Sequence, residues 1–594
     1  MVVPARKDRV ALEIPRTGLH GGGRTVARRP AWPSRFLATH GWSLIAFAPA
    51  AAVALPVLVV FSSLLAPNLE VWSHLAATVL WRYVASTFGL ALGVAIGVMV
   101  IGVGTAWLVT MCRFTGRGVV EWALLLPFAV PAYIIGYTYT DLLQFAGPVQ
   151  TGLREAMGWS TRADYWFPEI RSLGGAIVVM SLVFYPYVYL LSRAAFLEQA
   201  ACVLDVSRTL GRGPWRTFLE VAVPLARPAI AAGVALALME TLADLGTVAH
   251  FGVDTFTTGI LRTWFALGEP TAAAQLAAAL MMFVLLVLTL ERWMRGRARY
   301  EHTAPSRTLP AYRLRSLRAA LALAACSAPI ALGFALPVAV LLDMTMRTGD
   351  PLLGPAFLDL ARNSFVLAGA AALLTAALAV LVAYGLRLRP TPVMRLLARV
   401  STLGYAIPGA VIAIGVLIPF ARLDNARDAG MRDAFGISTG RRLTGTIAGL
   451  IFAYLVRFFA IAFNSAEAGL AKVNRNLDDA ARLLGHPPGA TLMRVHVPLV
   501  RSSVLTAIII VFVDVLKELP ATLILRPFNF ETLAVRVYRF AADERLAEAS
   551  SAALAIVVVG IIPVILLSRA IMRTRRRPAA DTPTVAATAR SRGW

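Results

Sequence analysis

The stretch DAARLLG at residues 479–485, followed downstream by VHVP at 495–498, has a second copy in this chain. The other copy is DVSRTLG at 205–211, followed by VAVP at 221–224. The copies lie 274 residues apart, and this offset holds without a gap from the aspartate to the last proline. Two copies at one long spacing indicate a duplicated unit and not a short-period repeat. The chain is therefore expected to consist of two similar halves.

Each copy predicts a helix, a break and a second short helix. An aspartate is favourable near a helix N-terminus, and Gly211 and Gly485 are typical of the positive φ that ends a helix. Pro214 and Pro488 suit the first turn of the next helix, where the missing N–H costs little. The final proline of each copy marks the entry to a long apolar run. We therefore expect a short amphipathic helix between two breaks, as a docking surface for a partner. The alternative is a plain helical hairpin between membrane spans.

At these residues the chain resembles the permease subunits of ABC importers. Their EAA loop has an acid, two alanines, three residues, a glycine, nine residues and an aliphatic-x-aliphatic-Pro end. The copy at 479–498 fits with Asp479 in place of the usual glutamate, whereas Val206 and Ser207 replace both alanines in the copy at 205–224. In that family the loop is cytoplasmic and inserts its helix into an ATP-binding subunit. We call residues 205–224 motif loop 1 and residues 479–498 motif loop 2.

The resemblance implies an ATPase-coupling role for matching residues of both motif loops. They are Asp205, Arg208, Gly211, Pro214 and Pro224 in motif loop 1, and Asp479, Ala480, Ala481, Gly485, Pro488 and Pro498 in motif loop 2.

Composition places the chain in a bilayer. Its 594 residues are 58% hydrophobic, mean hydropathy is +0.69, and the apolar residues form runs long enough for helices that cross a membrane. This predicts an all-α polytopic membrane protein with about twelve transmembrane helices in two pseudo-symmetric six-helix halves. The predicted spans are 43–65, 87–111, 119–143, 175–192, 229–251 and 272–290, then 319–342, 364–384, 400–420, 444–462, 503–525 and 550–567.

The charge pattern predicts the orientation. The net charge of +24 does not indicate nucleic acid, because the arginines are concentrated in tails and short loops, as the positive-inside rule requires of cytoplasmic segments. We expect a bacterial inner-membrane protein with both termini and both motif loops in the cytoplasm. The predicted units are a basic tail (1–42), a first permease half (43–290), a cytoplasmic linker (291–318), a second permease half (319–570) and a basic tail (571–594).

No catalytic pattern is found in the sequence. A Walker A loop needs Gly, four residues and Gly-Lys-Ser/Thr, and Lys7, Lys472 and Lys517 all lack that context. The sequence also has no His-Glu-x-x-His zinc site, and its three cysteines are scattered. We therefore expect a transport subunit, not an enzyme, that binds no cofactor of its own. ATP would bind a separate subunit, and no metal site is assigned.

Ionisable residues recur inside corresponding spans of the two halves. Glu240 and Asp244 lie four residues apart, hence on one face of a helix, and Asp514 and Glu518 stand at the same offset of 274. Such groups are costly in a membrane helix and usually face a bundle interior or an aqueous path. They are candidates for a translocation path between the halves. The alternative is local pairing, with Lys517 balancing a neighbouring acid.

A stretch rich in tyrosine, glycine and proline, at residues 127–141, adds Tyr133 as a further candidate for the path. A tyrosine there could instead belong to an interfacial aromatic belt.

Three further stretches resemble one particular group of ABC importer permeases. LPFAVPAYIIGY at 126–137, KELPAT at 517–522 and RPFNFET at 526–532 resemble ferric-iron importer permeases, in which both halves are fused in one chain. This implies a periplasmic solute-binding protein, an ATP-binding subunit dimer on the cytoplasmic side, and a path for ferric iron. Fused permeases for thiamine, phosphonate or polyamine share this layout. The rival classes are an ion-coupled secondary transporter, which needs no ATPase, and an intramembrane enzyme.

Overall fold

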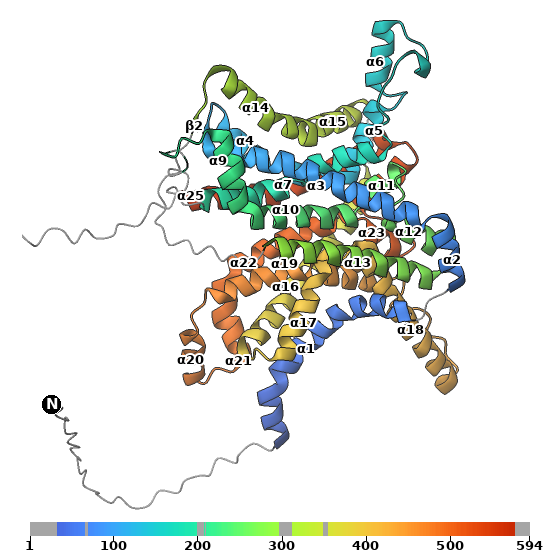
Figure 1. The fold of residues 1–594 in the computed structure, drawn as a ribbon. Coiled ribbons are helices and arrows are strands. Elements are labelled where there is room, and N and C mark those ends of the chain that lie inside the picture. Colours follow the sequence, from blue (N-terminus) through green and yellow to red (C-terminus); the bar gives the residue numbers. More distant parts are fainter. Residues whose placement is uncertain are drawn as a thin grey trace, which may run out of the picture.

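The computed structural model describes residues 32–65, 69–198, 207, 209–295, 312–348 and 354–575. This part of the chain is a bundle of helices with one short parallel strand pair, β1 (Cys112–Arg113) and β2 (Tyr312–Arg313) (Figure 1). Within it, eleven helices are long and apolar enough to cross a membrane, or twelve if one bent pair counts as a single span. The prediction of an all-α polytopic protein with about twelve spans is confirmed.

The two halves contain similar series of helices. The first half has α1 (Trp32–Ser62), α2 (Leu69–Thr78), α3 (Leu80–Met111), α4 (Arg117–Ala123), α5 (Ala132–Leu143), α6 (Pro148–Met157), α7 (Leu173–Glu198), α9 (Pro214–Thr217), α10 (Val223–Ala243), α11 (Gly246–His250), α12 (Phe256–Leu261) and α13 (Pro270–Arg295). The second half has α14 (Ser316–Ile330), α15 (Leu336–Thr348), α16 (Pro355–Leu388), α17 (Pro392–Thr402), α18 (Gly409–Phe435), α19 (Ile447–Ala471), α20 (Asn476–Leu483), α21 (Pro488–Thr491), α22 (Val497–Leu516), α23 (Pro520–Leu525), α24 (Leu533–Ala542) and α25 (Ser550–Arg575).

The first helix of each half packs against the other half. Helix α1 lies along α16, α17 and α18, and Ser401 Oγ donates to the carbonyl of Ala50 in α1 over 2.8 Å. Helices α14 and α15 cover α3, α4 and α5 of the first half, where Tyr139 donates to the Leu332 carbonyl over 2.9 Å. This exchange ties the halves together and places their shared core between them.

Three predicted spans have different limits. The third is bent by 91° around Pro131, which caps α5 and has no N–H for a continuous helix. The fifth and eleventh end at Ala243 and Leu516 and not at Phe251 and Leu525. Short separate helices, α11 and α23, follow these ends, so the fifth and eleventh spans are interrupted.

The ninth span starts later than predicted, and the tails also differ. Helix α18 begins at Gly409 after Pro408 and runs to Phe435, whereas the prediction was 400–420. Helix α1 begins inside the predicted tail 1–42, and α25 continues to Arg575. Residues 1–31, 296–311 and 576–594, which hold most of the predicted tails and linker, lie outside the described residues.

Prolines are accommodated inside long helices by π-helical turns. The turns Phe218–Ala222, Ala331–Ala335 and Leu492–His496 each end two residues before a proline, namely Pro224, Pro337 and Pro498. A proline removes one i→i−4 hydrogen bond and crowds the carbonyl of that residue. The wider π turn shifts the local pattern to i→i−5.

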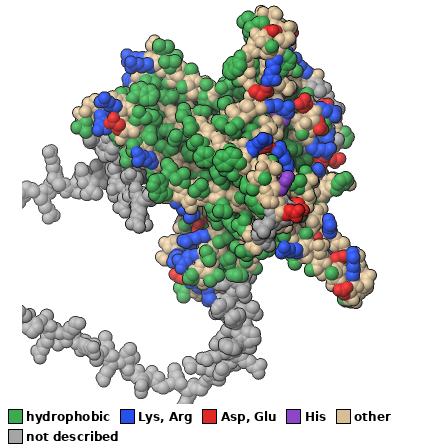
Figure 2. Space-filling model, turned by 45° about the vertical axis from the view of Figure 1, so that its right-hand side comes forward, with side chains coloured by type: hydrophobic (Ala, Val, Ile, Leu, Met, Phe, Trp, Pro, Cys, Tyr) green, Lys and Arg blue, Asp and Glu red, His purple; other side chains and the backbone are tan. Residues whose placement is uncertain are grey.

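Surface chemistry divides the molecule into a middle and two ends. Figure 2 shows hydrophobic side chains over the middle of the visible face, with charged groups gathered toward the outer ends. Such a hydrophobic belt matches the hydrocarbon core of a bilayer. The protein is therefore a multi-pass membrane protein.

Candidate functional site

Both motif loops lie at the same end of the bundle. Figure 1 places α9 of motif loop 1 and α20 and α21 of motif loop 2 on its left, opposite α2 and α6. Gly211 and Gly485 have φ of +75° and +77°, and Pro214 and Pro488 open α9 and α21. The predicted break at glycine and restart at proline are confirmed.

The predicted second break is wrong. Residues 214–243 and 488–516 each form one continuous helix, which passes Pro224 and Pro498 without ending. The π turns before these prolines explain the continuity. Each motif loop therefore presents the first turns of a membrane-spanning helix rather than an isolated short helix, and motion of the loop would pass directly into α10 or α22.

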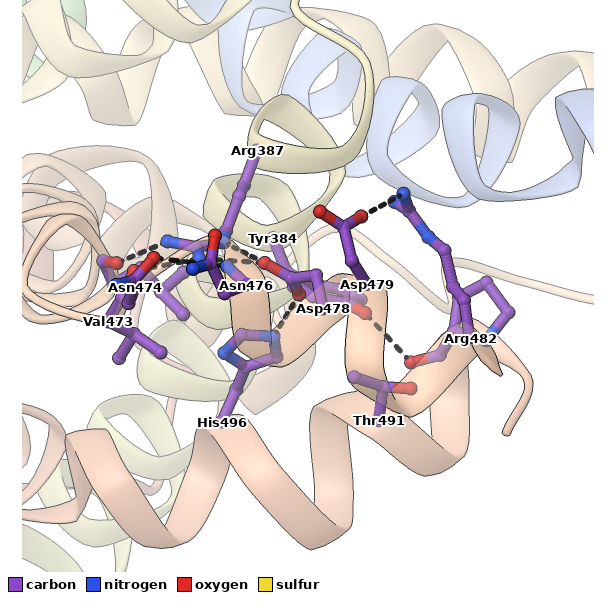
Figure 3. A network of polar contacts seen from close by, with 12 residues as sticks. Tyr384, Arg387, Val473, Asn474, Asn476, Asp478, Asp479, Arg482, Thr491 and His496 are labelled. Carbon is purple, nitrogen blue, oxygen red and sulfur yellow. Dashed lines mark hydrogen bonds and ion pairs between the residues drawn. The ribbon is translucent and has the colours of Figure 1, made fainter. Parts of the chain in front are cut away.

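A buried polar cluster anchors motif loop 2 (Figure 3). The carboxylate of Asp478 accepts hydrogen bonds from Arg387 Nε and Nη2 at 3.1 and 2.7 Å, and its other oxygen lies 2.6 Å from His496 Nε2. Arg387, near the end of α16, also donates to the carbonyls of Leu470 and Val473, where α19 ends. One arginine thus joins α16, α19 and α20.

Burial would raise the pKa of the Asp478 carboxyl, but the hydrogen bonds from Arg387 and His496 and the nearby positive charge outweigh it and lower the pKa below its usual value. Tyr384 adds a hydrogen bond of 3.0 Å to the carbonyl of Pro488 in α21. Asp478 therefore stays ionised in the folded protein near neutral pH and fixes the base of the loop.

Motif loop 1 is anchored by aromatic packing. Trp107 of α3 lies 5.7 Å from the ring of Phe196 and 5.0 Å from that of Phe218. The loop adds one buried polar contact, of 2.9 Å, between the hydroxyls of Ser207 and Thr217. Asp205 and Arg208, two of the predicted coupling residues, lie outside the described residues.

Both loops expose large apolar side chains. Leu483 and Leu484 of motif loop 2 are 89% and 77% exposed, and Leu210 and Trp215 of motif loop 1 are 70% and 74% exposed. Exposed apolar groups of this size mark a protein contact or a membrane contact. The apolar groups stand beside the positive-φ glycines, at the turn that each loop presents.

The five predicted path residues line one cavity between the halves. The cavity has a volume of about 100 Å³. Its polar lining consists of Tyr133, Tyr187, Glu240 and Asp244 from the first half and Tyr405, Arg457, Asp514, Lys517 and Glu518 from the second. Residues far apart in the sequence therefore meet where the halves touch.

The carboxylates of the cavity are held differently in the two halves. Asp244 follows the end of α10 and accepts from the backbone N–H of Thr247 and Val248 in α11, at 2.9 and 3.3 Å. It is therefore not on the helix face of Glu240, as predicted, but at a helix break. Its carboxylate satisfies two backbone N–H groups at the start of α11.

Glu518 and Asp514 form ion pairs. Arg457 Nε lies 3.3 Å from Glu518 Oε2, and Lys517 Nζ lies 2.9 Å from Asp514 Oδ1. Lys517 therefore pairs locally with Asp514, as the alternative interpretation predicted. The four carboxylates nevertheless also line the shared cavity. Among the described residues Glu240 has no ion pair or hydrogen bond of its side chain. The lining has four acids against two cations, which gives the cavity an excess of negative charge.

A family model for binding-protein-dependent transport system inner membrane components matches residues 99–299 and, a second time, residues 375–577. The chain belongs to this family. One match falls in each half, so the protein is a permease with two fused halves. The prediction from the duplicated motif is confirmed.

Individual relatives of the permease are also transport proteins. An Fe(3+)-transport system permease protein of Haemophilus influenzae is 27% identical over 492 residues, which cover 82% of this chain and 89% of the relative. A ferric transport system permease protein of Actinobacillus pleuropneumoniae is 23% identical over 421 residues, covering 68% and 58%. A molybdenum transport system permease protein of Escherichia coli is 28% identical over 207 residues, covering 32% and 83%.

Within motif loop 2, the predicted residues are not the anchors. Asp479 is exposed, and within the described part of the chain its side chain pairs with Arg482 on the loop surface, at 3.2 Å, whereas Ala481 is buried and Ala480 is exposed. The buried acid is Asp478, one residue earlier. A doubled aspartate at the start of a predicted helix was the signal available in the sequence.

In the cavity, sequence reasoning missed Arg457. This arginine is 6% exposed in the middle of α19. A lone arginine within an apolar span is costly unless paired, and that rule would have found it. No sequence pattern identifies Tyr187 and Tyr405 as cavity residues, by contrast, because their place in the lining depends on how the two halves meet.

Proposed function

We propose that this permease forms the path for ferric iron across the bacterial inner membrane, in an importer driven by a separate ATP-binding subunit. A periplasmic solute-binding protein would deliver the iron, and an ATP-binding dimer would dock on the two motif loops. The observation that carries the proposal is the ferric relative that matches 82% of the chain. ATP binds to the partner, and the permease itself binds no cofactor.

The orientation follows from the same proposal. The motif loops lie in the cytoplasm, where ATP is, together with both termini. The basic segments at 1–42, 291–318 and 571–594 support this side, because short arginine-rich segments stay in the cytoplasm. The end that carries α2 and α6 then faces the periplasm and the binding protein.

The charge of the cavity supports a cationic solute. Four acids against two cations attract a cation and repel an anion, and such interactions are stronger inside a low-dielectric bundle than in water. Glu240, which has no side-chain partner among the described residues, is the carboxylate most available to a passing cation. The match with the molybdenum permease covers only a third of this chain.

We infer that motif loop 2 opens the path through α19. Arg387 clamps the end of α19 at Leu470 to Asp478 of the loop, and Arg457 stands on the same helix about 20 Å away, at 1.5 Å per residue. Closure of the ATP-binding dimer would pull the loop and slide α19, which separates Arg457 from Glu518 after α22. Breaking that ion pair would open the cavity between the halves.

Reconstitution in liposomes tests the proposal. The permease, its ATP-binding subunit and its binding protein should take up radioactive ferric iron only when ATP is supplied. Glu240→Ala together with Asp514→Ala should lower uptake about tenfold, which corresponds to about 1.4 kcal/mol of lost attraction. Membrane insertion and copurification of the ATP-binding subunit should stay unchanged.

Two exposed carboxylates outside the cavity supply the matched control, Glu155→Ala together with Asp543→Ala. Because α6, which carries Glu155, lies on the end proposed to face the binding protein, affinity for that protein is measured in parallel. ATP-independent iron uptake would show a secondary transporter. Uptake of a different solute in place of iron would overturn the substrate, and normal iron uptake by the cavity variant would leave its carboxylates with a purely structural role.

A further inference from the structure

A larger cavity lies within the second half, beside the base of motif loop 2. Its volume is about 630 Å³. It is lined by the end of α16, by α17 and by the last turns of α19. The lining residues used below are Leu386, Arg395, Ala398, Arg399, Phe463, Glu467 and Arg475.

At the corresponding place in the first half, an ion pair lies in the interior of the bundle. Glu121 of α4 and Arg193 of α7 pair there, with side chains only 12% and 6% exposed. The offset of 277 that relates Pro131 to Pro408 takes Glu121 to Ala398, and the offset of 274 takes Arg193 to Glu467. The second half has an alanine and a carboxylate at these two positions, so the ion pair has no counterpart beside its cavity.

The cavity is strongly basic. Arg387, Arg395, Arg399 and Arg475 line it, with Glu467 as the single acid in the lining. Arg387 forms an ion pair with Asp478. Arg395 and Arg399, four residues apart and therefore on one face of α17, and Arg475, just before α20, make no ion pair or side-chain hydrogen bond among the described residues. The guanidinium groups of Arg395, Arg399 and Arg475 are therefore available to bind an anion.

Apolar side chains also adjoin these arginines. Leu386 and Phe463 contribute to the lining, and the neighbouring face of α17 exposes Val393 and Leu396, which are 57% and 62% accessible. Helix α17 is thus amphipathic, with arginines on one side and aliphatic groups on the other. This pattern is typical of a helix at the boundary between headgroups and acyl chains.

We propose that this cavity binds the phosphate headgroup of an anionic phospholipid. Arginine forks bind phosphate oxygens in pairs, and basic pockets between membrane helices on the cytoplasmic side bind such headgroups. Val393 and Leu396 would contact the acyl chains. A bound headgroup would bridge α17 to Arg475 and so brace the base of motif loop 2. The proposal concerns lipid alone and holds whichever solute the permease carries.

Lipid titration of the full-length permease in neutral detergent tests it. Phosphatidylglycerol, phosphatidylcholine and inorganic phosphate are compared by native mass spectrometry and by the midpoint of thermal unfolding. Phosphatidylglycerol should bind and stabilise, whereas the other two should not. Arg395→Gln together with Arg399→Gln should weaken phosphatidylglycerol binding about thirtyfold, at about 1 kcal/mol for each arginine.

Two variants provide the controls. Arg427→Gln with Arg441→Gln removes the same charge from exposed positions beside the far end of α18 and should change binding less than about twofold, as expected for distant independent sites. Ala398→Glu with Glu467→Arg copies the ion pair of the first half into the cavity. It should abolish the preference for phosphatidylglycerol without lowering the unfolding midpoint in phosphatidylcholine.

Three results would overturn the proposal. Unchanged phosphatidylglycerol binding in both cavity variants would show that the lipid does not use this cavity. Equal protection by inorganic phosphate would identify a free anion as the ligand. Loss of the ATP-binding subunit from the Arg395 and Arg399 variant, with lipid binding intact, would assign the arginines to a protein contact.

Discussion

The two motif loops share a backbone path but are fixed to the bundle by different forces. At motif loop 2, Arg387 of α16, Asp478 just before the loop and His496 within it form a buried charged clamp. In motif loop 1, Trp107 packs on Phe196 and Phe218. Trp107 stands where the second half has Tyr384, and Ala222 stands where it has His496. The duplicated glycines and prolines preserve the turn, and the anchor is free to diverge.

This difference has a physical consequence. A charged clamp depends on a few atoms, because removing one partner leaves another charge buried and unpaired. Aromatic packing is spread over many weak contacts and is insensitive to charge. The second loop should therefore respond sharply to a single substitution and to pH, and the first loop should respond to lost volume.

The largest effect is expected from Asp478→Ala. It leaves Arg387 buried without its carboxylate, at a cost of about 3–5 kcal/mol, and should release motif loop 2 from α16 and α19. The measurement is the thermal unfolding midpoint of the purified permease, together with copurification of the ATP-binding subunit.

Its neighbour supplies the control. Asp479→Ala removes an exposed acid with one surface ion pair, and such pairs contribute about 0–1 kcal/mol. The comparison fails if Asp479→Ala is the more damaging of the two, because the exposed acid would then be the important one.

Trp107→Ala should have the next largest effect. Truncation of a buried tryptophan costs about 3 kcal/mol or slightly more and should loosen motif loop 1 alone. Protease cleavage within each loop reports this selectivity, with faster cutting expected in 205–224 and an unchanged rate in 479–498. Trp107→Phe retains most of the packing, so its cleavage rate within 205–224 should be close to that of the unsubstituted protein.

A smaller effect is expected from pH. The pKa of Asp478 is lower in the folded state than in the unfolded chain, where it is about 3.9. The ionised carboxylate therefore contributes its full stabilisation above the unfolded pKa. This stabilisation is lost as the pH falls through the folded pKa. The difference in unfolding midpoint between the unsubstituted permease and Asp478→Asn should be constant above about pH 5 and shrink below about pH 4. Trp107→Ala should show no such trend.

The smallest effect is expected at the two glycines, and here the halves should agree. Gly211→Ala and Gly485→Ala place a side chain at positive φ, which costs about 1 kcal/mol each. No atom of the described residues lies within 4 Å of where either new Cβ would stand, so the expected cost is conformational. Unfolding midpoints that differ clearly between the two variants would show that the turns are not equivalent.

Much of the fold was predictable because membrane physics is visible in the sequence. Long apolar runs give the spans, and the repeated glycine and proline give the two motif loops. The errors occur at breaks. Asp244 follows the last residue of α10, and Pro520 opens α23 just after α22 has ended. The π turns carry helices past Pro224 and Pro498.

The candidate cavity was only partly predictable. Glu240, Asp244, Asp514 and Glu518 are conspicuous because ionisable groups are rare in spans.

The clamp at motif loop 2 was not predictable, because Arg387 stands out in the sequence only as one basic loop residue among many. Its role depends on contacts with Leu470 of α19 and Asp478 of α20, which lie 83 and 91 residues further along the chain.

The sequence by itself determined that this is a duplicated, membrane-spanning permease, since repetition and hydropathy are local properties of the chain. The tertiary structure decided which residues are partners. The clamp at Asp478, the Arg457–Glu518 pair and the empty place beside Ala398 all arise from contacts between distant helices, and the energy of a buried charge depends on what packs around it.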